Sequence, residues 1–92
     1  MTSGRLSKLQ QQILVWLWRD AQQIRFRPPA HSSYTDLMRE MLSDKSNVSR
    51  SIRTLERKGF IELGRSPAGY AVWVSLTGKG VLKAANLAKK DA

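Results

Sequence analysis

The spacing of apolar residues changes at Gly59, and this change limits the folds open to the chain. Before it, Val48, Ile52 and Leu55 recur at intervals of four and three residues, which places them on one face of a helix. After it, apolar residues of segment 60–76 recur at every second position, as in strands that bury one face. Gly59 itself suits the left-handed position that ends a helix. A helix followed by an antiparallel hairpin is therefore predicted around this glycine.

The hairpin is expected over about residues 60–76. Its turn, residues 64–69, is rich in Gly, Ser and Pro, and it places Arg65 near the tip. The inward face of the two strands is expected to comprise Ile61, Leu63, Val72, Val74 and Leu76.

Residues 7–24 form a predicted helix that is apolar on almost every side, and a proline-containing loop, residues 25–33, follows it. Leu14, Val15 and Trp18 point away from the main apolar stripe and form a second apolar patch. A helix of this kind is either central in its domain or shared with another subunit. The main stripe comprises Leu6, Leu9, Ile13, Trp16, Leu17 and Ile24.

Two short helices joined by a tight turn are expected over about residues 34–58. Ser33 and Asp36 have the spacing of a capping box before the first of them. Asp44 is placed to accept hydrogen bonds from the free amides that open the second, over residues 45–58. This arrangement is typical of a helix-turn-helix.

A fourth helix, capped by Thr77, is expected over about residues 78–89. The fold class is therefore mainly α with a small β-hairpin (α+β), in the order helix, helix, helix, hairpin, helix, and residues 1–92 form a single domain. The expected inner face of the fourth helix comprises Val81, Ala85 and Ala88, with Leu82 beside it.

The charge balance points to an anionic partner. Sixteen Lys and Arg against seven Asp and Glu give a net charge of +9, which favours a polyanion. A soluble protein with an incidentally basic surface is the alternative, and net charge does not separate the two. Because no run of apolar residues approaches the roughly 20 that span a bilayer, we expect no membrane partner and a cytoplasmic, nucleoid-associated location.

The sequence offers few residues suited to catalysis or to metal binding. The chain has no cysteine, which excludes disulfides, thiolate nucleophiles and thiolate metal sites. His31 is the only histidine, so neither a zinc site nor a histidine-centred triad can be assembled. We expect no enzyme activity, no metal and no cofactor.

Two segments resemble a known family. Residues 46–61, Ser-Asn-Val-Ser-Arg-Ser-Ile-Arg-Thr-Leu-Glu-Arg-Lys-Gly-Phe-Ile, resemble the recognition helix and first wing strand of winged helix-turn-helix regulators. Residues 76–80, Leu-Thr-Gly-Lys-Gly, resemble the segment that follows the wing in MarR-type members. Together the resemblance covers about residues 35–87. It implies sequence-specific binding of double-stranded DNA, with the third helix in the major groove and the wing near the minor groove.

The third helix carries the residue types that such a role needs. Arg50 is suited to guanine and Asn47 to adenine, and with Arg53 they are expected to discriminate between bases. An ordinary solvated helix face is the alternative. Residues suited to phosphate oxygens are Lys45, Ser46 and Ser49.

Two residues outside this helix are further candidates for DNA contact. Arg65 at the wing tip is placed to enter a minor groove, where negative potential is concentrated; a solvated turn arginine is the alternative. Thr35 is placed to offer its hydroxyl and amide to a phosphate, or simply to cap its helix.

Winged-helix regulators commonly dimerise through their terminal helices, which implies a homodimer that reads a two-fold site. The alternative is that the fourth helix or the wing, including Trp73, covers the patch within one chain. Expected interface residues are Leu14, Val15, Trp18, Leu82 and Leu87.

The sequence thus favours a dimeric transcriptional regulator, with an effector unknown. A winged-helix protein-protein interaction module within a larger nucleic-acid-associated assembly is the alternative function. Recognition of left-handed duplex or of RNA by the same fold is a further one.

Overall fold

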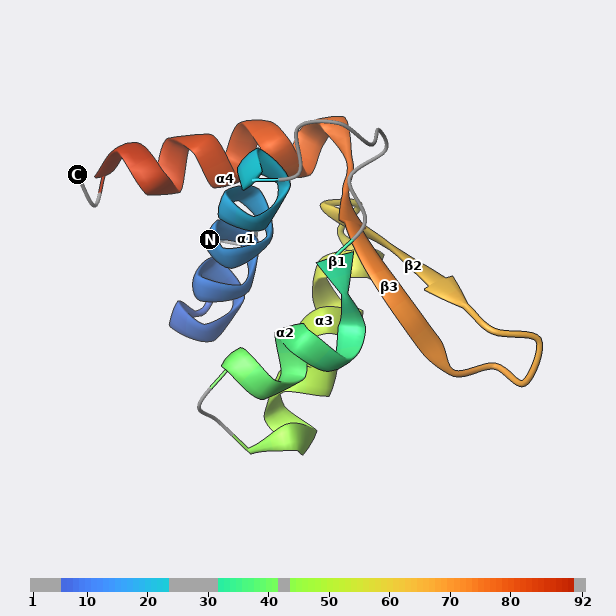
Figure 1. Cartoon of the computed structure of the whole chain (residues 1–92). Coiled ribbons are helices and arrows are strands. Elements are labelled where there is room, and N and C mark those ends of the chain that lie inside the picture. The colour runs from blue at the N-terminus through green and yellow to red at the C-terminus, as the bar shows by residue number, and fades with distance from the viewer. Residues whose placement is uncertain (1–5, 24–31, 42–43, 91–92) are drawn as a thin grey trace.

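The computed structural model describes residues 6–23, 32–41 and 44–90 (Figure 1). It confirms a mainly helical fold with a small antiparallel sheet. Most of the expected proline-containing loop, with His31, lies outside the described residues, as does the turn at residues 42–43. The elements are α1 (Lys8–Gln23), β1 (Ser32–Ser33), α2 (Tyr34–Glu40), α3 (Lys45–Arg57), β2 (Ile61–Arg65), β3 (Ala71–Leu76) and α4 (Gly78–Lys90).

The predicted caps of α2 and α4 are present. The Ser33 hydroxyl accepts a hydrogen bond from the Asp36 amide at 3.3 Å. The Thr77 hydroxyl accepts one from the Gly80 amide at 3.0 Å. Each bond satisfies one of the amides that a helix leaves unpaired in its first turn.

The ends of α3 agree with the prediction only in part. Gly59 follows the helix with a φ of +85°, the left-handed conformation that suits glycine. Asp44 occupies the N-cap position, but its side chain makes no capping hydrogen bond, so the capping role predicted for it is wrong. The backbone of Asp44 nevertheless begins the helix, since its carbonyl oxygen accepts from the Val48 amide at 3.0 Å.

A third strand, β1, joins the hairpin to give the sheet order β1-β3-β2, antiparallel throughout. Ser32 pairs with Val74 and Ser33 with Trp73. The Ser32 hydroxyl also donates a hydrogen bond to the Asp20 carboxylate at 2.5 Å, which ties the sheet to α1. Sequence pattern missed β1 because two serines carry no apolar alternation.

The hairpin buries one face, as the alternation predicts: Ile61 and Val74 are almost inaccessible to solvent. The register shifts near the end of β2, where Arg65 pairs with Ala71. Val72 is 52% exposed instead of facing inward. The irregularity explains this error, because a shift of one residue moves a side chain to the other face of a strand.

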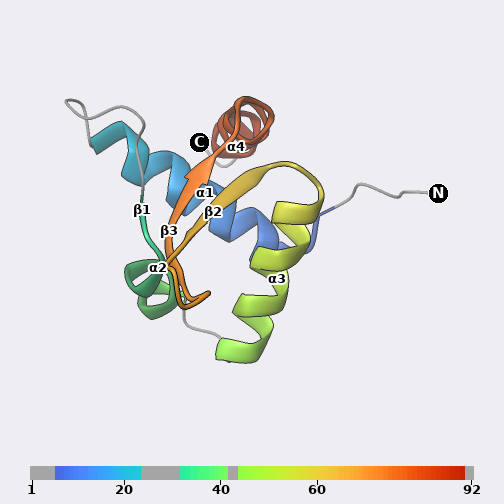
Figure 2. The same cartoon turned by 90° about the vertical axis from the view of Figure 1, so that its right-hand side faces the viewer.

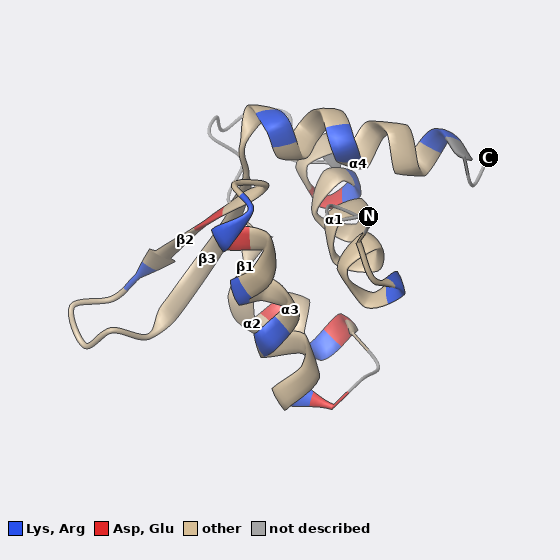
Figure 3. Ribbon diagram, turned by 180° about the vertical axis from the view of Figure 1, so that it is seen from behind, with Lys and Arg blue, Asp and Glu red and all other residues tan. Residues whose placement is uncertain are grey.

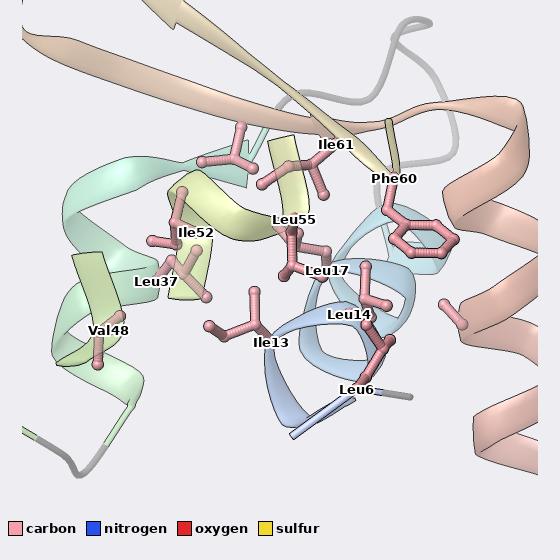
Figure 4. Packing of buried hydrophobic residues seen from close by; sticks show 12 residues of the cluster. Leu6, Ile13, Leu14, Leu17, Leu37, Val48, Ile52, Leu55, Phe60 and Ile61 are labelled. Carbon is pink, nitrogen blue, oxygen red and sulfur yellow. The ribbon is translucent and has the colours of Figure 1, made fainter. Parts of the chain in front are cut away.

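The core lies where α1 meets α3 and the sheet (Figure 4). Ile13, Leu14 and Leu17 of α1 are all fully buried, so the helix is apolar on two sides because it is central. Both views place α1 between α4 and α3 (Figures 1 and 2). Leu14 therefore belongs to the core, and its expected place on a separate surface patch is wrong.

The inner face of α4 is rotated from the predicted one. Ala84 is fully buried and Leu87 packs against the core, whereas Val81 is 42% and Leu82 70% exposed. α4 packs on α1, and the apolar spacing of α4 alone does not show which of its sides meets α1.

Candidate nucleic-acid interface

The outer face of α3 carries three arginines in line. Arg50, Arg53 and Arg57 are spaced at i, i+3 and i+7, so they fall on one side of the helix, and all three are exposed. The opposite side holds the buried residues of the helix and packs into the core. Among the described residues, none of these arginines forms an ion pair. Their charges are therefore presented to solvent. Figure 3 marks the Lys and Arg positions along the ribbon in blue.

An open concavity of about 710 Å³ lies along this face, bounded on one side by α2. It brings together five of the predicted DNA-contacting residues, and four of its nine lining residues are basic. Its lining comprises Tyr34, Met38, Lys45, Ser46, Ser49, Arg50, Arg53, Thr54 and Arg57.

Four lining residues were not among the predicted contacts: Tyr34, Met38, Thr54 and Arg57. The signal for Arg57 was present, because its spacing from Arg53 and Arg50 is helical. Tyr34 and Met38 are separated by one helical turn on α2, but an apolar pattern of this kind does not distinguish a core stripe from the wall of a groove. Both side chains are half-buried: they pack against the core and also form the wall of the concavity.

Three predicted contacts lie outside the concavity: Asn47, Thr35 and Arg65. Asn47 is exposed but does not line the concavity; it lies about 120° around the helix axis from Arg53 and about 60° from Arg50. Thr35 is exposed in the first turn of α2, next to the lining residue Tyr34. The structure therefore gathers Lys45, the two serines, Arg50 and Arg53, but not these three.

Arg65 is ion-paired within the fold. It is the last residue of β2 and follows Ile61 and Leu63 on the strand face that looks toward α3. Its guanidinium donates two hydrogen bonds to the carboxylate of Glu56, Nη1 to Oε2 at 3.3 Å and Nη2 to Oε1 at 3.4 Å. Arg65 is therefore an ion-paired residue of β2 and not a solvated turn residue, and its contact with a minor groove stays a prediction. The strand runs further than the turn residues indicate, which brings the side chain to α3.

The expected dimer residues fall into three groups. Leu14 is buried and unavailable to a second subunit, whereas Leu82 is exposed. Val15, Trp18 and Leu87 are partly buried, and the last two pack against the core. The alternative, in which α4 covers the apolar patch of α1 within one chain, therefore accounts for much of the burial of these residues.

Within the described ranges, no cluster of His, Asp and Glu side chains is arranged to bind a metal ion. None of the helices described has the length and apolarity needed to cross a bilayer.

Comparison with solved structures reveals a common architecture. A mutant form of ZitR from Lactococcus lactis is 20% identical with a TM-score of 0.70, over 97% of this chain and 55% of that one. The adhesin competence repressor AdcR from Streptococcus pyogenes is 16% identical with a TM-score of 0.72, over 95% and 58%. MepR from Staphylococcus aureus, solved as a complex with DNA, is 19% identical with a TM-score of 0.69, over 91% and 63%.

These likenesses confirm the winged-helix fold and its MarR-like arrangement. At such identities they concern the fold alone. The chain spans little more than half the length of the structures that it matches. No family sequence model matches the chain, and comparison with curated proteins found no match.

Proposed function

We propose that this protein is a transcriptional regulator that binds double-stranded DNA through the concavity between α2 and α3. The observation that carries the proposal is the line of Arg50, Arg53 and Arg57, exposed and without ion pairs among the described residues. Three cations at helical spacing match the phosphates and base edges that flank a major groove. The likeness in fold to MepR, which was solved in a DNA complex, supports the same reading.

Roles within the site follow from side-chain chemistry. Arg50 and Arg53 are proposed to reach base edges, because a guanidinium can bind guanine with two hydrogen bonds. Lys45, Ser46 and Ser49 lie toward the start of α3 and suit phosphate oxygens. Residues outside the concavity are assigned lesser roles: Thr35 is close enough to its edge for a phosphate contact, and Asn47 for a contact at the margin of the groove.

We also propose that the regulator acts in the cytoplasm, associated with the nucleoid, as a homodimer that presents two copies of α3. Leu82 is the strongest remaining interface candidate, because an exposed leucine on a terminal helix gains most from burial. Val15, Trp18 and Leu87 would contribute their exposed parts. Leu14 is left out of this interface.

Selection of bound sequences from a random duplex pool tests the proposal. A two-fold symmetric enriched motif is the expected result, since it requires both base recognition and a dimer. An enriched motif without symmetry would support recognition by one subunit and remove the dimer. A pool that stays random through repeated rounds would contradict sequence-specific binding.

The second candidate is a protein-protein interaction module, favoured by the neighbouring exposed residues Val81 and Leu82 on α4. Salt dependence separates the two functions. DNA affinity falls steeply as the salt concentration rises, because protein binding releases counterions from the duplex and added salt opposes this release. The affinity of a contact between apolar surfaces does not fall in this way.

A further inference from the structure

The single acidic residue of α3, Glu56, holds the arginine of the wing. Both nitrogens of the Arg65 guanidinium that face it are engaged, at 3.3 and 3.4 Å. Glu56 lies one residue before Arg57 and three after Arg53, beside the cationic line of the proposed DNA surface. The pair therefore joins the wing to the very helix that is proposed to enter the groove.

The strand period produces this contact. Ile61 and Leu63 direct their side chains toward the core and α3, and residue 65 continues that face beyond the edge of the core. The register shift at Gly64/Arg65 ends the regular pairing at the same point. Arg65 thus emerges where Glu56 is within reach.

Carboxylate and phosphate are competing partners for one guanidinium, because both accept two parallel hydrogen bonds from it. The Arg65 side chain is 47% exposed and that of Glu56 33% exposed, so a phosphate can approach the pair. While Nη1 and Nη2 each donate to Glu56, the carboxylate neutralises the charge of Arg65, so the arginine adds no net cation to a duplex lying against α3. The net charge of the pair is zero.

We infer that Glu56 withholds Arg65 from the DNA backbone and thereby limits the sequence-independent affinity of the protein. Glu56 is a positioning residue in this scheme, since it acts through Arg65. The inference rests on the proposed function. It predicts that Arg65 contributes to binding only after Glu56 has been neutralised.

A double-mutant cycle on a random duplex tests this, using anisotropy titrations at several salt concentrations. Arg65→Gln in the native background should change the affinity by less than about twofold. In the Glu56→Gln background, Arg65→Gln should remove about one phosphate contact from the dependence of log affinity on log salt concentration. The loss of affinity between about 50 and about 200 mM salt should then be roughly 3.5-fold smaller than with Arg65 present.

Glu62→Gln is the matched control, because it removes the same charge from an exposed position on β2 that makes no ion pair with a described residue. Arg65→Gln should remain without effect in that background. Far-ultraviolet circular dichroism and thermal melting of each variant check that it is folded.

Two results would contradict the inference, and they are distinguishable. If Arg65→Gln has the same effect in the native and Glu56→Gln backgrounds, then Glu56→Gln also has the same effect with and without Arg65, because both comparisons belong to one cycle. Glu56 would then act only as a repelling charge and would not withhold Arg65, so the inference fails while DNA binding stands. Absence of duplex binding by the native protein at low salt would overturn both the inference and the proposed function.

Discussion

Gly80 lies against the main-chain carbonyl oxygen of Phe60, so close that a β-carbon on residue 80 would overlap that oxygen. Gly80 is in the first turn of α4, and Phe60 precedes β2. The contact therefore fixes the start of α4 against the root of the wing. The Thr77 amide donates to the same carbonyl oxygen at 3.0 Å, which leaves little room for it to move.

We predict that Gly80→Ala destabilises the fold, although alanine favours helices. An extra methyl group forced against the backbone costs about 1 to 3 kcal/mol. Over most of that range the cost exceeds the gain in helix propensity, which is about 1 kcal/mol. Chemical denaturation measures the change. Gly78→Ala is the matched control, because nothing lies within 4 Å of its β-carbon position. A Gly80→Ala variant as stable as Gly78→Ala would show that the contact is not tight.

Thr77 joins the same region with a second set of contacts. Its hydroxyl donates to the Gly59 carbonyl oxygen at 2.6 Å and accepts from the Gly80 amide at 3.0 Å. Thr77→Ala removes both bonds and should lower the free energy of unfolding by about 1 to 2 kcal/mol. Thr77→Ser keeps the hydroxyl and should retain most of that stability. Equal losses in the two variants would assign the effect to the lost methyl group.

Arg50→Ala is expected to weaken binding to a selected site by roughly 1 to 3 kcal/mol and to relax the base preference at one position. The reason is that a guanidinium bonded to a base edge carries sequence information, whereas one bonded to phosphate does not. Titrations against the selected and a scrambled duplex measure both effects. An equal loss on the two duplexes would make Arg50 a phosphate contact.

Asn47→Ala should have a smaller effect than Arg50→Ala on the selected duplex. Asn47 is absent from the concavity, and it lies about 120° around α3 from Arg53, although only about 60° from Arg50. Parallel titrations of the two variants make the comparison. A loss from Asn47→Ala as large as that from Arg50→Ala would show that the duplex contact extends beyond the concavity to the Asn47 side of Arg50.

The dimer is tested at Leu82, which is 70% exposed, so that a polar substitution leaves the fold of one chain intact. Leu82→Asp should shift sedimentation from a dimer toward the 10.4 kDa monomer at micromolar concentration. Tyr70→Asp, at an equally exposed aromatic residue on the wing, serves as the control and should not. Sedimentation of the native protein as a monomer would contradict the proposed dimer.

Much of the fold follows from local pattern, because each signal has a direct physical cause. The stripe of Val48, Ile52 and Leu55 defines α3, and the glycine after it defines its end. The switch to a period of two defines the wing. Periodicity failed for Leu14 and α4, because an apolar surface on a helix does not reveal which neighbour covers it.

The site was predicted less completely than the fold. Helical spacing indicates the cationic face of α3, but it does not show which part of that face adjoins α2. The concavity is therefore lined by Tyr34, which was not predicted, and not by Asn47, which was. The pairing of Arg65 with Glu56 depends on how far β2 extends, and turn residues alone do not determine that length.

Amide chemical-shift mapping during titration with a short duplex tests the central claim most directly. The account predicts that shifts concentrate in α3 around Arg50 and Arg53 and in the facing part of α2, and that they diminish as salt is raised. Shifts confined to α4 around Leu82, or the absence of shifts along α3 at low salt, would contradict it.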